Sequence, residues 1–298
     1  MFRVRRLLAP FVLCIALLFS EAQAFTIAWL SDTQNYHNAY KPIFDGMTQW
    51  ISDNRAALDI RFVFHTGDVV GSWSSEDQWW QARESMGILS SASIPFLTVC
   101  GNHDIGYRMN YANFLKYVLS LRPASMSQEY GDTGSRYELF SANGRDYIFM
   151  GIAFSNKGPS EDEVNWINGV LRQYSSRDAI IITHSYLKKS ASYTTQGKAI
   201  FEKIVKANPN VFLVLCGHCR DISYKNVQLD DDGDGNPDRT VYAILSNFQG
   251  GKAGGGGYMR ILDFRDSDIY IYTYSPYYDS CEYPKYPKGK TEATVPLP

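Results

Sequence analysis

The feature that most constrains the fold of this chain is a repeated pairing of a short apolar run with polar side chains directly after it. In the clearest case, residues 96–100 form an apolar run that leads through Gly101 to Asn102, His103 and Asp104. An amide, an imidazole and a carboxylate in a row are unfavourable in an apolar core, because buried polar groups need partners. This stretch therefore predicts a functional site at the end of a buried strand.

The same pairing recurs along the chain. Other apolar runs end at polar residues of the kinds that bind metals, namely Asp32 with Gln34, Asp68, His184 and His218. In open α/β sheets, ligands bind beyond the carboxyl ends of the strands. We therefore expect these side chains to lie close together at one edge of the fold.

Hydrophobic periodicity predicts strands that alternate with helices up to about residue 218, followed by hairpins. The predicted strands cover residues 25–30, 60–65, 96–100, 136–140, 147–154, 179–183, 211–215, 240–245, 258–264 and 268–274, and the predicted helices 40–54, 75–90, 110–121, a segment capped by Ser160, and 195–207. This order favours an α/β fold of two packed sheets with helices outside, in one domain over residues 25–274. The tail over residues 275–298 is rich in Pro, Tyr and Lys, and we expect it to be irregular.

Composition places the chain among ordinary globular proteins. It has 298 residues, of which 45% are hydrophobic and 20% charged, and a net charge of −2. Such a balance gives no overall basic footprint for nucleic acid. We leave the oligomeric state open.

Residues 1–24 are typical of a cleavable secretory signal. Three arginines precede an apolar stretch, and Ala22-Gln23-Ala24 is a small-x-small cleavage site, so we expect cleavage after Ala24 and a secreted or periplasmic protein. A membrane anchor is the alternative, but the apolar run is short for a spanning helix, and no later stretch could span a bilayer. Disulfide pairing stays open, because Cys100 and Cys216 each end an apolar strand, where a buried free thiol is as plausible as a disulfide.

The candidate ligands are carboxylates, amides and imidazoles. This donor set suits Mn, Fe, Zn or Mg, and does not suit Cu(I) or an iron–sulfur cluster. A single carboxylate can bridge two such metal ions, and the two metal ions together would bind the oxygens of a phosphoryl group.

In their order, these motifs resemble those of the calcineurin-like metallophosphoesterases. The matching pieces are the aspartate of the first motif, Gly67-Asp68, Gly101-Asn102-His103-Asp104, His184 and Gly217-His218. The resemblance implies a four-layer α/β/β/α sandwich. It also implies a small phosphorylated substrate, a phosphomonoester or phosphodiester, that is hydrolysed by a water that the metal activates. It further implies that Asp68 bridges two ions, that Asn102, His184 and His218 complete one site, and that Asp32 begins the other. His103 would be the general acid, oriented by Asp104.

Two departures from the family pattern affect the same metal position. Gln34 stands where the first motif normally has histidine, and Arg220 stands where the last motif normally has its second histidine. A Gln oxygen coordinates more weakly than imidazole, and Arg does not coordinate at all. We therefore expect one tight and one weak site, with Gln34 either a ligand or a hydrogen-bonding neighbour. Arg220 would either grip phosphate oxygens or form a surface ion pair.

The altered position leaves a second interpretation open, a non-catalytic envelope binder of phosphorylated or carbohydrate ligands with a degenerate metal site. Two further segments are read separately. Residues 230–238 resemble a calcium loop. We interpret them first as a solvated acidic turn and second as a site that binds calcium weakly. The glycine-rich residues 250–257 predict a flexible loop near the site mouth, with Asn247 and Gln249 within reach of the site.

Overall fold

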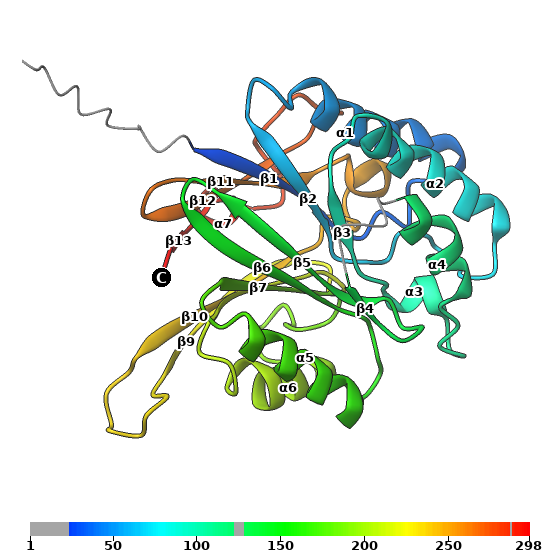
Figure 1. Cartoon of the computed structure of the whole chain (residues 1–298). Helices are drawn as coiled ribbons and strands as arrows, with labels where there is room; N and C mark the ends of the chain where they lie inside the picture. The colour runs from blue at the N-terminus through cyan, green and yellow to red at the C-terminus, as the bar shows by residue number, and fades with distance from the viewer. Residues whose placement is uncertain (1–23, 122–127, 287) are drawn as a thin grey trace, which may run out of the picture.

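A computed structural model describes residues 24–121, 128–286 and 288–298. The predicted signal segment therefore lies outside the described residues, apart from Ala24. The chain folds into two mixed sheets (Figure 1). The first sheet has six strands in the order β13-β12-β11-β1-β2-β3, and the second has seven in the order β4-β5-β6-β7-β8-β10-β9. The pairs β1·β2, β2·β3, β6·β7, β7·β8 and β8·β10 are parallel.

Apart from β4, β9 and β13, which were not predicted, the strands lie close to the positions that hydrophobic runs predict. Their bounds are Phe25–Leu30 (β1), Ile60–His65 (β2), Phe96–Thr98 (β3), Gln128–Tyr130 (β4), Ser135–Ala142 (β5), Arg145–Ile152 (β6), Asp178–Thr183 (β7), Val211–Cys216 (β8), Ile222–Leu229 (β9), Arg239–Ser246 (β10), Met259–Phe264 (β11), Asp268–Tyr274 (β12) and Ala293–Pro296 (β13). The α-helices are Lys41–Asp53 (α1), Glu76–Ser91 (α2), Asn102–Ile105 (α3), Ala112–Tyr117 (α4), Glu161–Gln173 (α5), Thr195–Ile200 (α6) and Lys288–Thr291 (α7).

Helices cover the outer face of each sheet, which confirms the predicted α/β/β/α sandwich. Figure 1 shows α1, α2 and α4 on one side and α5 and α6 on the other. Residues of α1 and α2 pack with β1 and β2 in one apolar cluster, and residues of α5 and α6 pack with β6 and β7 in a second. A third cluster lies between the sheets and is rich in aromatic rings, among them Phe62, Phe64 and Phe149. Their edge-to-face contacts hold the two sheets together.

Three expectations about elements are corrected. The predicted helix over residues 110–121 is split into α4 and a 3₁₀ turn at Leu119–Leu121. Strand β9 was not expected, because its burial alternates and its apolar signal is weak. The tail was expected to be irregular, but β13 pairs with β12 through Ile269 and Val295. Val295 is buried between the sheets, and β13 is an edge strand, where Pro296 is tolerated.

Among the described helices, none is long and apolar enough to cross a membrane.

Candidate metal centre

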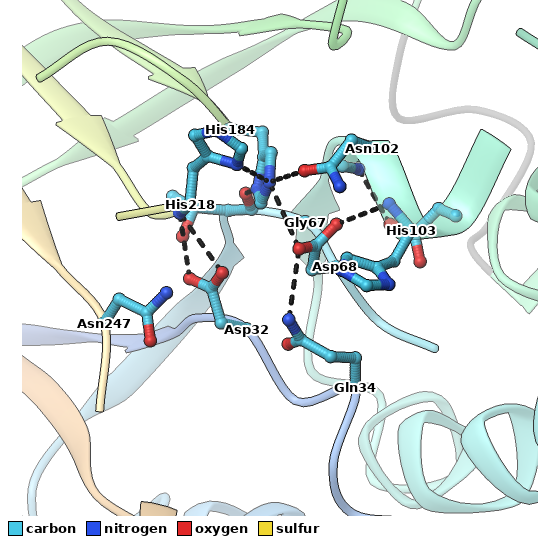
Figure 2. A network of polar contacts seen from close by, with 12 residues as sticks. Asp32, Gln34, Gly67, Asp68, Asn102, His103, His184, His218 and Asn247 are labelled. Carbon is cyan, nitrogen blue, oxygen red and sulfur yellow. Dashed lines mark hydrogen bonds and ion pairs between the residues drawn. The ribbon is translucent and has the colours of Figure 1, made fainter. Parts of the chain in front are cut away.

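The candidate site is built where parallel strands from both sheets end. Asp32 follows β1, Asp68 follows β2, and Asn102 begins α3 after β3. His184 follows β7 and His218 follows β8. The structure therefore brings together, at one edge, the side chains that the sequence placed at separate strand ends (Figure 2).

Three side chains converge on the Nε2 atom of His184. It lies 3.1 Å from Nδ1 of His218, 3.2 Å from Oδ1 of Asn102 and 3.3 Å from Oδ2 of Asp68. His184 Nδ1 lies 2.8 Å from the carbonyl oxygen of Thr66. Because a carbonyl oxygen can only accept a hydrogen bond, Nδ1 carries the proton that is donated to Thr66. The opposite ring nitrogen, Nε2, therefore points toward the other three groups.

This convergence fits a divalent cation. Acceptor atoms of Asp68, His184 and His218 all lie within 4.8 Å of one another. Burial opposes protonation of His184, but the charge and hydrogen bond of Asp68 outweigh it and raise the pKa of His184 to about 9. Burial likewise opposes ionisation of Asp68, yet the charge of His184 leaves the pKa of Asp68 below its usual value. The pair thus favours a positive charge at this point, which a metal ion would supply to all the ligands at once.

Asp32 and Gln34 form the other half of the site. Gln34 Nε2 donates to Asp68 Oδ2 over 3.1 Å, and Gln34 Oε1 is buried without a hydrogen-bond partner among the described residues. Asp32 accepts from the backbone N–H of His218 at 3.1 and 3.2 Å. Burial raises the pKa of Asp32 to about 7, with the charge of Asp68 acting in the same direction. A buried carboxylate beside an unpaired amide oxygen is a donor set that a hard cation would satisfy.

The backbone carries strain at these strand ends. Asp32, Asp68 and His218 have positive φ values of 54°, 53° and 71°, a region that non-glycine residues rarely adopt. The adjoining glycines leave room for the carboxylates. A Cβ on Gly101 would lie 2.2 Å from Oδ1 of Asp68, and a Cβ on Gly217 would lie 2.3 Å from Oδ2 of Asp32.

His103 lies at the rim of the site, with its side chain exposed and its backbone N–H donating to Asp68 Oδ1 over 2.9 Å. The sequence predicted that Asp104 orients this ring, but that prediction is wrong. Asp104 accepts three backbone N–H groups, from residues 69, 70 and 101. His103 Nδ1 lies 2.9 Å from the carbonyl oxygen of Gly71 instead. Asp104 is turned inward because α3 begins here, and its third residue reaches back to the N-terminal backbone.

Arg220 is exposed and follows His218 by two residues. Its Cδ lies 3.6 Å from the position that a Cβ on Gly250 would take, so its stem packs beside the glycine-rich segment. Within the described part of the chain, its guanidinium forms no ion pair, so the expected surface ion pair is not supported. The other expectation, that Arg220 binds phosphate oxygens, stays a prediction.

One further side chain lies at the site, Asn247, which the sequence placed within reach of the site but not among the candidate ligands. Asn247 follows β10, just as the other candidates follow their strands, and Figure 2 shows it beside Asp32. Its Oδ1 accepts from the backbone N–H of Gln249, while its Nδ2 is buried without a partner among the described residues. Carbonyl oxygens also contribute, from Thr66 and Gly71. Backbone groups of this kind have no signal in the sequence.

The remaining candidates stay outside the site's ligand cluster. His65 is fully buried and bonded to Thr33, and burial lowers its pKa to about 3, so it is a neutral structural residue at the end of β2. All four cysteines from residue 100 onward are free. Acidic oxygens of Asp230, Asp232 and Asp238 lie within 4.8 Å of one another on an exposed loop, and calcium binding there stays a prediction.

Comparison with known proteins agrees with this geometry. A model of the calcineurin-like phosphoesterase family matches residues 25–219. The chain belongs to this family. Its Asp68, His184 and His218 could together hold a metal ion.

One curated relative is an uncharacterized protein, YvnB, from Bacillus subtilis (strain 168), 41% identical over 259 residues. The match covers 85% of this chain but 20% of the relative, so the chain spans about one fifth of the relative's length.

Solved structures share the fold at low sequence identity. A dimetal phosphatase from Danio rerio is 14% identical with a TM-score of 0.62, over 91% of this chain and 98% of that one. GAP50, the anchor in the inner membrane complex of Plasmodium, is also 14% identical with a TM-score of 0.59, over 92% and 89%. A purple acid phosphatase from yellow lupin is 12% identical with a TM-score of 0.59, over 92% and 54%.

Proposed function

We propose that the protein is an exported metal-dependent phosphoesterase that hydrolyses a phosphomonoester or phosphodiester of a small molecule. The observation that carries this proposal is the convergence of Asp68, Asn102 and His218 on Nε2 of His184. Export rests on the N-terminal signal in the sequence, and the ester's identity depends on loops whose specificity is not readable from the ligand set.

Divalent ions bound here would lower the pKa of water toward neutrality and stabilise charge on the phosphoryl oxygens. Asn102, His184 and His218 would hold one ion, Asp32 and Gln34 the other, and Asp68 would contact both. The donor set suits Mn, Fe, Zn or Mg. Nitrogen ligands are confined to one side, so we infer that this side binds tightly and that the Asp32/Gln34 side binds weakly or only with substrate.

His103 is suited to protonate the departing oxygen. Its Nδ1 is held by the Gly71 carbonyl oxygen, which leaves Nε2 to carry the proton that is donated. Its backbone N–H is bonded to Asp68, so the acid and the shared ligand keep a fixed relation. The contribution of Asp104 is to position the backbone at Gly101 and at the loop after Asp68.

Arg220 is suited to bind non-reacting phosphoryl oxygens. Guanidinium can donate two parallel hydrogen bonds to a phosphate and remains charged at any physiological pH. Its exposure and its place two residues after His218 allow it to meet a substrate that enters from solvent.

The test is hydrolysis of a generic aryl phosphate, as monoester and diester, with added Mn²⁺. We expect turnover by the wild type, and an Asp68→Asn variant that loses it together with bound metal. Asp162→Asn, on the exposed start of α5, is the matched control and should change neither. Metal-independent hydrolysis, or full activity in Asp68→Asn, would contradict the proposal.

A non-catalytic binder is the second candidate, and the replacement of imidazole by Gln34 and Arg220 is the observation that favours it. The same experiment separates the two. A binder would retain phosphorylated ligands in a metal-dependent way and would hydrolyse neither ester with any of the four ions.

A further inference from the structure

A cavity of about 620 Å³ lies between the glycine-rich segment and the C-terminal tail. Its lining includes Gly250 and Lys252 on one side, and Tyr278, Tyr283 and Lys285 on the other. Tyr258, directly before β11, forms part of the wall. The size is typical of small-molecule pockets, which are mostly apolar with a few polar groups.

Tyrosine rings shape this cavity. Tyr258 and Tyr283 are buried and meet edge to face with their ring centroids 4.7 Å apart, so this part of the wall is fixed. Tyr278 differs, because 45% of its surface is exposed. A Cβ on Gly256 would lie 2.3 Å from Cε2 of Tyr278, so this ring lies directly on the glycine backbone. A supported but exposed ring is available to stack on a ligand.

The cavity adjoins the metal centre along the chain. Gly250, in its lining, packs beside the stem of Arg220 and follows Asn247 by three residues. Asn247 in turn stands beside Asp32 (Figure 2). The segment that closes one side of the metal centre therefore continues into the wall of the cavity.

The exposed lining of the cavity is mostly apolar, which favours a flat ring over a sugar. Ser280 Oγ already accepts from the N–H of Glu282, and the carbonyl oxygen of Glu282 accepts from the hydroxyl of Tyr258. A sugar would need free donors and acceptors for its hydroxyls, whereas an aromatic ring needs only ring faces. Lys252 and Lys285 form no ion pair in the part of the chain that the structure describes. They outnumber the one carboxylate of the lining, Glu282, so the charge of the cavity suits an anionic ester.

We propose that this tyrosine-lined pocket binds the aromatic ring of a phosphoester whose phosphoryl group lies at the metal centre. The inference rests on the proposed function and adds a substrate class to it, esters of ring-bearing alcohols. Tyr278 is then a specificity residue that does not touch the reacting atoms.

The experiment compares naphthyl and ethyl phosphates, each as monoester and diester, in the wild type and three variants. Tyr278→Ala should lower kcat/KM for the naphthyl ester about tenfold, as expected for the loss of one ring contact, and leave the ethyl ester unchanged. Tyr278→Phe keeps the ring and should retain both activities. Tyr40→Ala is the matched control, because Tyr40 is exposed to the same 45% as Tyr278 but does not line the cavity.

Binding of naphthyl phosphonate, measured by calorimetry, gives a readout that needs no turnover. Tyr278-dependent binding without hydrolysis of any ester would support the pocket and overturn the proposed function. Hydrolysis with equal effects of Tyr278→Ala and Tyr40→Ala on the naphthyl ester would overturn the pocket and leave the function intact. Absence of both hydrolysis and binding would overturn both.

Discussion

The two halves of the metal centre share Asp68 but differ in the rest of their donors. On one side, Asn102, His184 and His218 present an amide and two imidazoles. On the other side, the atoms of Asp32 and Gln34 that can bind a metal are all oxygens, including the unpaired Oε1 of Gln34. Imidazole adds affinity for borderline metals, whereas carboxylate and amide oxygens suit harder ions such as Mg²⁺ and Mn²⁺. The two ion positions should therefore differ in both affinity and selectivity.

The largest effect should come from the imidazole side. His184→Ala removes the atom on which the other ligands converge, so metal affinity should fall more than about a hundredfold, beyond the loss caused by removing a ligand's hydrogen-bond partner. Metal content per chain and aryl phosphate hydrolysis measure the result, with Asp162→Asn on the exposed start of α5 as the control. Because His184 is fully buried, Asn102→Ala on the same side provides a second variant with less risk to folding. Unchanged metal content in both variants would show that the imidazole side is not the tight metal site.

The general acid should affect turnover without affecting either ion position. His103→Ala should lower kcat by about 10² to 10⁴ for an ester with a poor leaving group, and much less for one with a good leaving group. Metal analysis should find the wild-type content, because the side chain of His103 is not among the converging ligands. Equal losses for both esters would assign His103 a structural role at Asp68.

Much of the fold and the ligand set could be predicted because strand ends leave strong signals. Buried parallel strands are continuous apolar runs, and polar residues directly after them are rare without a purpose. Asn102, His184 and Asp68 were all found in this way. The same rule would have added Asn247 to the site as firmly, but the glycine-rich residues after it drew the interpretation toward a flexible loop.

What could not be predicted depends on the backbone. Asp104 was assigned to His103 because the two are adjacent in sequence, but the turn into α3 points its carboxylate at backbone N–H groups. The carbonyl oxygens of Gly71 and Thr66 take the places that side chains were expected to fill. Strand β13 was missed because it has only one buried residue, Val295, and the Pro and Lys residues around it indicate irregular structure.

The weaker side can be strengthened to sharpen the comparison. Gln34→His restores an imidazole beside Asp32 and Asp68, and should tighten the second ion about ten- to a hundredfold, with a shift toward Zn²⁺. Titration of metal-free protein, followed by calorimetry, should then find two tight ions per chain in place of one. Gln49→His, on the exposed face of α1, controls for non-specific binding by a new histidine. Two tight ions already present in the wild type would contradict the asymmetry itself.

The smallest effect should come from Arg220, which replaces an imidazole with a charge that cannot coordinate. Arg220→Ala should raise KM about three- to tenfold, because the loss of an exposed charge-assisted contact to phosphate is screened by water. Arg220→Lys should recover part of this loss, since lysine keeps the charge but not the bidentate geometry. Neither variant should alter metal content. If metal content rises in Arg220→His but KM does not change in Arg220→Ala, the position is an abandoned ligand site, and Arg220 has no role in binding substrate.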